Sequence, residues 1–389
     1  MPTHGAARVA DFEELVREKT PESLVDYYAT GAGDEQTLQD SLKAFQRFRL
    51  KPRVLWSKGN IDMTTKLQGQ TVSFPLGISP TGFQCAAHPE GEKATAKAAE
   101  RTEIIMIVSS WAMIPLEAPP AAAPNARLWM QVYPFRDRRN TVDMIRRAER
   151  SGYKAIVITV DSPQIGLFTR SWRSGRQINQ QLRELKIRGT TSLAFCIFQC
   201  RLVNLQGAKD DVARAKASGD EFLFTYGREQ TESMATWADI AWIKSITKLP
   251  IILKGIMTAE SAREAVAAGV QSIIVSAHGG RQLDGIQAPI EALPEVVDSV
   301  RGSGLEVYLD GGVRSGRDIF KALAIGAKAV FIGRPVIWGL LHNGKDGIVE
   351  ILNMLKNEFR NTMSLCGCTG VKDISRAYVR HESQLTCKL

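Results

Sequence analysis

A repeated pattern limits the folds that this chain can adopt: short apolar runs alternate with helix-like segments. Eight runs have the length and the content of Val, Ile and Leu that are typical of buried strands. The segments between them carry Ala, Glu, Arg and Leu at helical spacing, and several close at a glycine. Strands are predicted at residues 75–79, 104–109, 127–132, 155–160, 249–253, 272–276, 305–309 and 328–332, and the clearest helices at 92–101, 141–150, 258–268, 290–301 and 317–325.

Eight strands alternating with helices predict an α/β fold of the (β/α)8 TIM-barrel type. In such a barrel the carboxyl ends of all strands meet on one face, which is the catalytic face. A doubly wound open sheet is the alternative, but no Gly-x-Gly-x-x-Gly turn follows the first predicted strand. The barrel is therefore the preferred prediction.

We expect one domain overall, built from a barrel with flanking segments. Its parts are an N-terminal helical cap in residues 1–70, the barrel in 71–365 and a C-terminal tail in 366–389. The clearest helices of the cap are predicted at 11–18 and 22–30. Residues 167–235 form a long insertion after the fourth strand, and such connections are often lids.

The bulk composition excludes several classes of protein. The 389 residues, with 44% hydrophobic content, are enough to bury a sizeable core. The net charge of +9 comes from basic residues scattered among acids, so we expect no nucleic-acid partner. The six cysteines lack paired zinc spacing, which predicts free thiols and no metal site. No apolar run approaches the length of about twenty residues that spans a bilayer, so we expect a soluble protein.

Polar residues follow three successive predicted strands and indicate a site at the catalytic face. His278 and Arg281 follow the run 272–275 and offer a base and a cation together. A histidine can accept a substrate proton near neutral pH, although a lone histidine is more often a core residue. The next two strands are followed by Asp310-Gly311-Gly312-Val313-Arg314 and by Gly333-Arg334. Barrels commonly hold a phosphate in these two loops, because glycine lets backbone N–H groups come close to the phosphate oxygens. The alternative is that the glycines only close tight turns.

These motifs resemble the signature of the FMN-dependent 2-hydroxyacid oxidase family, which includes glycolate, lactate and long-chain 2-hydroxyacid oxidases and the mandelate dehydrogenases. The resemblance is carried by Ser276–Asp284, Asp310–Arg314 and Gly333-Arg334-Pro335. It covers nearly the whole chain, because further motifs follow in family order: Asp26-Tyr27-Tyr28, Pro80-Thr81-Gly82, His88–Glu92, Ser109-Ser110-Trp111, Thr159-Val160-Asp161 and Leu253-Lys254-Gly255. Residues 80–83 and 251–256 are most similar to the peroxisomal long-chain (S)-2-hydroxyacid oxidases.

The resemblance implies FMN as the cofactor and gives individual residues a role. His278 matches the family's catalytic base, Asp161 the carboxylate that orients it, and Arg281 the cation that binds the substrate carboxylate. Tyr27 and Tyr133 match tyrosines that hydrogen-bond the substrate, and the resemblance also implies a catalytic role for Tyr133. Taken singly, Asp161 could be a turn cap and Lys254 a surface lysine. The residues that match FMN contacts are Pro80, Thr81, Gly82, Ser109, Gln131, Thr159, Lys254, Ser276, Asp310, Gly311, Gly312, Arg314, Gly333 and Arg334.

Two positions depart from the family pattern. The arginine expected seven residues after Asp161 is replaced by Phe168, and Arg170 lies two residues further on. An arginine there would help to clamp the substrate carboxylate. Ala277 stands where the family usually has Asn before the histidine, which removes one side-chain hydrogen bond near the site.

The expected activity is the FMN-dependent oxidation of (S)-2-hydroxy acids to 2-oxo acids, with O2 reduced to H2O2. Gly82 lacks the methyl group of an alanine, which predicts room for medium-chain, long-chain or otherwise bulky substrates. One alternative is a dehydrogenase that passes electrons to another carrier. Another is a flavin-binding pseudoenzyme, weakened by Phe168 and Ala277.

The last three residues predict a cellular location. Cys387-Lys388-Leu389 nearly reproduces the Ser-Lys-Leu peroxisomal address. We therefore expect recognition by the peroxisomal import receptor and a location in the peroxisome, with the cytoplasm as the alternative. Production of peroxide suits that compartment, and the family resemblance implies a homo-oligomer.

Overall fold

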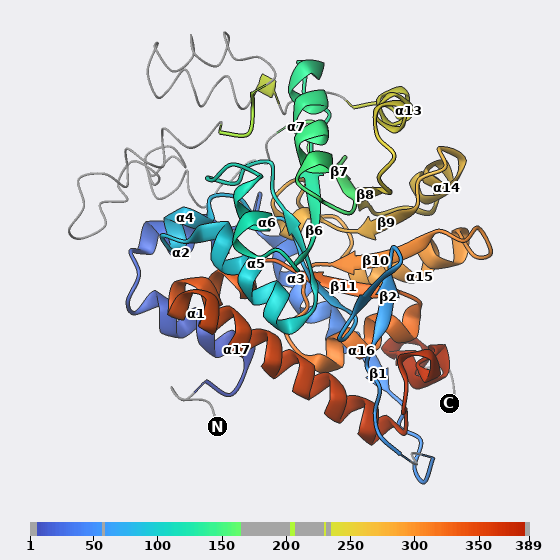
Figure 1. The fold of residues 1–389 in the computed structure, drawn as a ribbon. Helices are drawn as coiled ribbons and strands as arrows, with labels where there is room; N and C mark the ends of the chain where they lie inside the picture. The colour runs from blue at the N-terminus through green and yellow to red at the C-terminus, as the bar shows by residue number, and fades with distance from the viewer. Residues whose placement is uncertain (1–5, 57–58, 165–202, 207–228, 231–234, 386–389) are drawn as a thin grey trace.

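A closed barrel of eight parallel strands forms the centre of the protein (Figure 1). The computed structural model describes residues 6–56, 59–164, 203–206, 229–230 and 235–385. All eight predicted strands are present, which confirms the (β/α)8 barrel and excludes the open sheet. In order around the barrel they are β10 (Glu306–Asp310), β11 (Ala329–Ile332), β4 (Leu76–Ile78), β5 (Ile105–Val108), β6 (Arg127–Val132), β7 (Ile156–Thr159), β8 (Ile251–Ile256) and β9 (Ser272–Val275).

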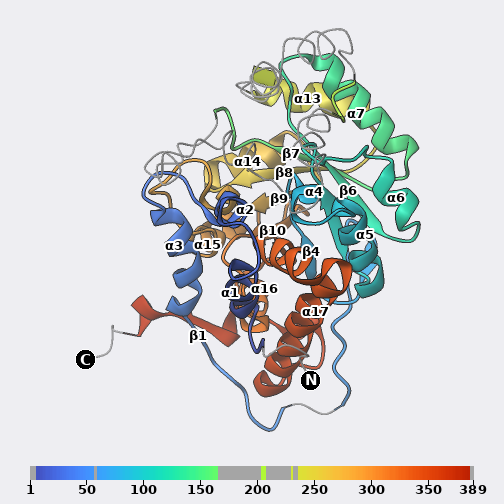
Figure 2. The same ribbon diagram turned by 90° about the vertical axis from the view of Figure 1, so that its left-hand side faces the viewer.

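Helices surround the barrel (Figure 2). They bury the outward-facing side chains of the strands. The predicted helices are found within three residues of their expected starts. The surrounding helices are α4 (Gln84–Ala87), α5 (Gly91–Thr102), α6 (Ala118–Ala122), α7 (Arg138–Arg150), α13 (Trp237–Ile246), α14 (Ala259–Ala267), α15 (Pro289–Ser299), α16 (Gly316–Ile325) and α17 (Arg334–Cys366).

Large side chains fill the interior of the barrel. The rings of Trp129, Tyr308 and Phe331 lie with centroids 5.6–5.9 Å apart and are completely buried. The hairpin of β2 (Thr65–Leu67) and β3 (Gln70–Val72) adds Leu67 and Val72 to this cluster. At its turn, the Gln68 N–H donates to Glu306, the first residue of β10, so the hairpin closes the amino end of the barrel. The carboxyl ends of the strands remain for a site.

The N-terminal segment lies against the carboxyl ends of the strands. Its helices α1 (Val9–Arg17) and α2 (Glu22–Ala29) agree with the prediction, and α3 (Gln36–Lys43) follows them. The Asp284 carboxylate accepts the N–H groups of Asp34, Gln36 and Thr37, and so fixes the start of α3 to the loop after β9. The expectation that residues 1–70 are mostly helical is wrong after residue 47, because β1 (Phe48–Leu50) and β2 are strands.

The C-terminal segment returns to the N-terminal one. Helix α17 bends at Asn343 and Gly344, and the chain then forms β12 (Val379–His381), which pairs antiparallel with β1. In the part of the chain that the structure describes, no helix combines the length and apolar character needed to cross a bilayer.

Candidate active site

An Asp–His pair lies at the carboxyl ends of β7 and β9. His278 Nδ1 is 2.8 Å from Asp161 Oδ1, and the two side chains are 24% and 14% exposed. Ser276 Oγ accepts the His278 N–H at 3.1 Å, which helps to hold His278 at its left-handed φ of 51°. A Cβ on Gly255 would lie 2.5 Å from that of Asp161, so the close approach of β8 requires glycine there. The structure therefore brings the predicted base and its orienting carboxylate together.

The charge state of Asp161 sets the role of His278. Burial alone would raise the pKa of Asp161, but the charges of His278 and Lys254 and hydrogen bonds from His278 and Ser162 outweigh it and hold the pKa below its ordinary value. An ionised Asp161 accepts a hydrogen bond from the Nδ1–H group of the histidine. Nε2 is then the nitrogen that can accept a proton from a bound molecule.

The three predicted substrate-binding residues are gathered beside this pair. The Arg281 guanidinium lies 5.3 Å from the centroid of the Tyr27 ring, and its Nη1 donates to the carbonyls of Tyr27 and Thr30 at 2.9 Å each. Burial, followed by the nearby charges of Asp161 and Tyr27, raises the pKa of Tyr133 well above its ordinary value. Tyr133 therefore stays protonated and can donate a hydrogen bond to an anion.

Hydrogen bonds connect the polar side chains at the ends of β5, β6 and β7. Gln131 Oε1 accepts from the N–H and the hydroxyl of Ser110 at 3.0 and 3.1 Å, and its Nε2 donates to Thr159 Oγ1 at 3.1 Å. Ser109 Oγ accepts the Trp111 N–H at 3.1 Å. Of the predicted FMN contacts, Gln131 and Thr159 are therefore joined by a hydrogen bond, and Ser109, next to Ser110, is buried like them.

Lys254 lies between the acids of the site. Its Nζ is 3.7 Å from Asp310 Oδ2, and its side chain is only 5% exposed, which excludes a surface lysine. Ser79 Oγ donates to the same Asp310 oxygen at 3.0 Å. Among the described residues, Asp310 Oδ1 and Asp161 Oδ2 are buried without a hydrogen-bond partner. Such atoms indicate that a polar molecule completes this site.

Arg314 and Arg334 are partly buried cations whose guanidinium groups donate to backbone carbonyls, that of Val313 for Arg314 and that of Tyr28 for Arg334. Burial, together with the charges of Arg281 and Arg314, lowers the pKa of Arg334 to about 9. Burial also lowers the pKa of Arg314. An anion bound here would relieve this repulsion, so these residues fit a phosphate.

The two predicted phosphate loops differ in how well they could bind an anion. Gly311 and Gly312 have left-handed φ values of 95° and 78°, and a Cβ on Gly312 would lie 2.0 Å from the carbonyl oxygen of Ser41. The tight-turn explanation therefore accounts for Gly312. The first turn of α16 is already capped by Ser315 and by the Asp318 carboxylate. Helix α17, in contrast, begins at Gly333 without a side-chain cap, so its amino end is the better anion-binding element.

In the loop after β4, the contacts around Gly82 give a reason for this glycine that differs from the sequence prediction. Thr81 accepts two hydrogen bonds from the Gln84 amide, and Tyr28 donates to the Gly82 carbonyl at 3.2 Å. A Cβ on Gly82 would lie 2.9 Å from the Cβ of Trp111. The missing methyl group therefore lets Trp111 approach at this point, and the preference for a bulky substrate stays a prediction. Pro80 precedes this loop directly.

Sequence reasoning missed Ser162, which contacts the Asp–His pair, and Gln282, which donates a hydrogen bond to Ser162. Ser162 Oγ lies 3.0 Å from Asp161 Oδ1 and 3.3 Å from His278 Nδ1, and it accepts from Gln282 Nε2 at 2.7 Å. Each follows an assigned residue directly, Ser162 after Asp161 and Gln282 after Arg281. This position next to an assigned residue is the sequence signal that could have indicated them.

The departures from the family pattern lie partly outside the described residues. Phe168 and Arg170 do so, and so do most of residues 167–235. Ala277 is described and is 4% exposed, directly before His278.

Comparison with known proteins places the chain in a family. The family model described as FMN-dependent dehydrogenase matches residues 16–381. The chain belongs to the FMN-dependent dehydrogenase family. FMN is therefore its cofactor, as the resemblance implied, and the chain is an FMN-dependent oxidoreductase.

Relatives in this family match over nearly their whole length. The chain is 42% identical to 2-hydroxyacid oxidase 1 of Mus musculus, covering 98% of both chains. It is 44% identical to a peroxisomal (S)-2-hydroxyacid oxidase of Arabidopsis thaliana, covering 97% of both. Among solved structures, mandelate oxidase with (S)-4-hydroxymandelic acid matches with a TM-score of 0.83 and 34% identity, over 96% of this chain and 98% of the other.

Proposed function

We propose that this FMN-dependent dehydrogenase oxidises (S)-2-hydroxy acids to 2-oxo acids and that O2 reoxidises the flavin to give H2O2. The observation that carries the proposal is the His278–Asp161 pair, 2.8 Å apart, beside Arg281, Tyr27 and Tyr133. A base, a cation and hydroxyl donors on one face are what removal of a proton from a bound hydroxy acid requires. The names of the relatives, 2-hydroxyacid oxidase and mandelate oxidase, support the same reaction.

Each residue has a physical role in this proposal. Arg281 binds the substrate carboxylate, and Tyr27 and Tyr133 donate hydrogen bonds that orient the substrate. His278 Nε2 accepts the substrate proton, and ionised Asp161 stabilises the imidazolium that forms. Ser162 contacts both Asp161 and His278 and so helps to fix their relative orientation.

Other residues hold FMN, which when bound accepts the two electrons of the oxidation. Arg314, Arg334 and the amino end of α17 at Gly333 bind the phosphate. Lys254 would stabilise negative charge on the flavin ring, because it is a buried cation at the strand ends. The residues that line the ring are Pro80, Thr81, Gly82, Ser109, Gln131, Thr159, Ser276 and Asp310, with Gly311 and Gly312 toward the phosphate.

The substrate proposed from the sequence is a medium-chain, long-chain or bulky 2-hydroxy acid. Trp111 Cβ lies only 2.9 Å from where a Cβ on Gly82 would be, so we propose that Trp111 limits the size of the substrate. Values of kcat/KM for a series from glycolate to medium-chain acids test this preference. A maximum at glycolate would refute it.

The first experiment follows the colour of the bound flavin. The purified holoprotein, mixed anaerobically with a medium-chain (S)-2-hydroxy acid, should lose its visible absorbance and form peroxide when air returns. His278→Gln should abolish the bleaching, whereas His381→Gln, on β12, should not. Flavin that stays oxidised with several 2-hydroxy acids would refute the proposal.

Two alternatives are separated by the same assay. Bleaching without peroxide would indicate a dehydrogenase that uses another electron acceptor. Bound flavin without bleaching would indicate a pseudoenzyme, a reading that Ala277 supports because it offers no side-chain hydrogen bond before His278. In that case Phe168→Arg combined with Ala277→Asn should raise activity sharply.

Location and assembly complete the proposal. Cys387-Lys388-Leu389, outside the described residues, binds the peroxisomal import receptor, and the peroxisomal relative of Arabidopsis supports this compartment. Deleting Leu389 in a fluorescent fusion should redirect the protein to the cytoplasm. We also propose a homo-oligomer, which light scattering of the holoprotein tests.

A further inference from the structure

The loop that follows β5, residues 109–117 and here called the β5 loop, reaches the site through Trp111. Ser109 Oγ accepts the Trp111 N–H, and the Trp111 carbonyl accepts the N–H of Phe83 at 3.2 Å. The rings of Phe83 and Trp111 lie 6.3 Å apart, and the ring of Tyr27 lies 5.8 Å from that of Phe83. These aromatic rings form a wall beside Arg281, so the position of Trp111 affects the shape of the substrate site.

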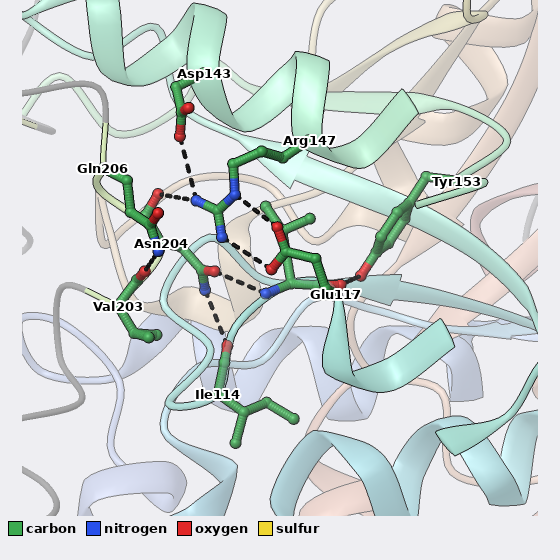
Figure 3. A network of polar contacts seen from close by, with 9 residues as sticks. Ile114, Glu117, Asp143, Arg147, Tyr153, Val203, Asn204 and Gln206 are labelled. Atoms are coloured by element: carbon green, nitrogen blue, oxygen red, sulfur yellow. Dashed lines mark hydrogen bonds and ion pairs between the residues drawn. The ribbon is translucent and has the colours of Figure 1, made fainter. Parts of the chain in front are cut away.

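One side chain holds the second half of the β5 loop. Asn204, which is 1% exposed, lies in the described stretch 203–206 of the long connection between β7 and α13. Its Nδ2 donates to the Ile114 carbonyl at 3.2 Å (Figure 3). Its Oδ1 accepts the N–H of Leu116 at 2.8 Å, and Nδ2 also donates to the carbonyl of Ala112 at 3.4 Å. A single buried amide thus satisfies three backbone groups of the β5 loop.

Asn204 is itself fixed to the barrel by Arg147 of α7. Arg147 Nη1 donates to the Asn204 carbonyl at 3.2 Å, while Nε and Nη2 bind the two oxygens of Glu117 at 2.7 and 2.9 Å (Figure 3). The Arg147 side chain is only 7% exposed. Tyr153 adds a hydrogen bond to the Leu116 carbonyl at 2.7 Å. Because the guanidinium binds Glu117 through two parallel bonds, Asn204 is held in a fixed orientation.

We propose that Asn204 is a positioning residue for the oxidation reaction, because it fixes the β5 loop and thereby sets the place of Trp111. The inference rests on the proposed function and extends it to the long connection after β7. Within the described residues, the side-chain hydrogen bonds of Asn204 go to the backbone of the β5 loop and not to His278 or Arg281. Its effect therefore passes through the backbone of residues 112–116.

Loss of the Asn204 amide should affect substrate binding more than the chemical step. Three buried backbone groups would be left without partners, and the β5 loop would shift to reach water. Trp111 would move with the loop, whereas His278 and Asp161 are held by β9, β7 and Gly255. The KM for 2-hydroxy acids should therefore rise more than kcat falls.

The test compares Asn204→Ala with a control two residues away. Gln206 donates to the Val203 carbonyl at 2.9 Å and not to the β5 loop, so Gln206→Ala should behave as wild type. Asn204→Ala should raise KM about tenfold with kcat changed less than about threefold, and should alter the visible circular dichroism of bound FMN. Asn204→Asp keeps the acceptor for Leu116 but loses the donor, so it should have an intermediate effect, and it serves if the alanine variant does not fold.

A double-mutant cycle with Trp111→Phe separates positioning from a structural role. In the Trp111→Phe background, Asn204→Ala should lose most of its effect on KM, because the two residues act on one wall. Additive effects on KM, or an unchanged KM and flavin spectrum in Asn204→Ala, would overturn the inference. If the wild type oxidises no 2-hydroxy acid, the proposed function fails, while the dichroism of the substrate-free holoprotein still tests the positioning.

Discussion

Glu92 offers a quantitative test, because its carboxyl is completely buried between two loops of the site. It lies on α5, and its Oε1 accepts the N–H of Gln84 at 3.3 Å and of Met113 at 3.4 Å. Gln84 follows Gly82 and Phe83, and Met113 belongs to the β5 loop, so one carboxyl joins these two segments. Burial raises the pKa of Glu92 to about 7, although these hydrogen bonds oppose the shift.

The raised pKa predicts a stability that falls as the pH rises. In the unfolded chain Glu92 has its ordinary pKa of 4.5, so between 4.5 and about 7 the folded protein keeps a proton that the unfolded chain has released. The contribution of the protonated carboxyl to the free energy of unfolding is fully present below pH 4.5 and is lost as the pH rises through about 7. At about 1.4 kcal/mol per pKa unit, the total is about 3 kcal/mol, most of it lost between pH 5 and 8.

Glu92→Gln keeps the shape of the protonated side chain and removes its titration. We expect the free energy of unfolding of the wild-type holoprotein, measured in urea, to fall by about 2–3 kcal/mol more than that of Glu92→Gln between pH 5 and 8. Glu90→Gln is the matched control, because Glu90 is exposed and its hydrogen bond with Lys97 lowers its pKa. Parallel pH profiles of wild type and Glu92→Gln would show that the carboxyl is not neutral in the folded protein.

Three further substitutions test the site. Asp161→Asn should slow flavin reduction at least about a hundredfold in stopped-flow measurements while FMN affinity stays unchanged, and an unaltered rate would contradict the role of the pair. Gly82→Ala should lower the thermal midpoint, at a cost of about 1–3 kcal/mol, because the new Cβ meets Trp111; equal stability would refute the contact. Arg334→Met should weaken FMN binding at least about tenfold in a fluorescence titration, whereas Met at the exposed Arg317 should not.

The sequence was sufficient for the barrel and for the residues at its strand ends. Runs such as 272–275 are apolar, short and bounded by polar residues, and a parallel barrel is the fold in which eight such runs share one face. His278, Asp161 and Lys254 each follow a predicted strand, so their meeting at that face follows from topology. The ordered family motifs added the flavin, which the strand pattern alone does not specify.

Contacts between distant segments could not be predicted in this way. Gly82 and Gly312 suggest open space or a phosphate contact from sequence, yet their neighbours are Trp111 and the carbonyl of Ser41. Those neighbours follow from how helices and loops pack, not from a local pattern. Asn204 gives no signal in its own stretch of sequence, because its partners lie about ninety residues earlier in the chain.

The pairing of β1 with β12 has a consequence for how the protein is made. Phe48 pairs with His381 and Leu50 with Val379, so β1 must wait for almost the entire chain to be synthesised before it finds its partner. The segment that includes β1 also supplies Tyr27. A chain shortened by a dozen residues at its end would lack β12, and β1 would be left as an unpaired strand next to the segment that carries Tyr27.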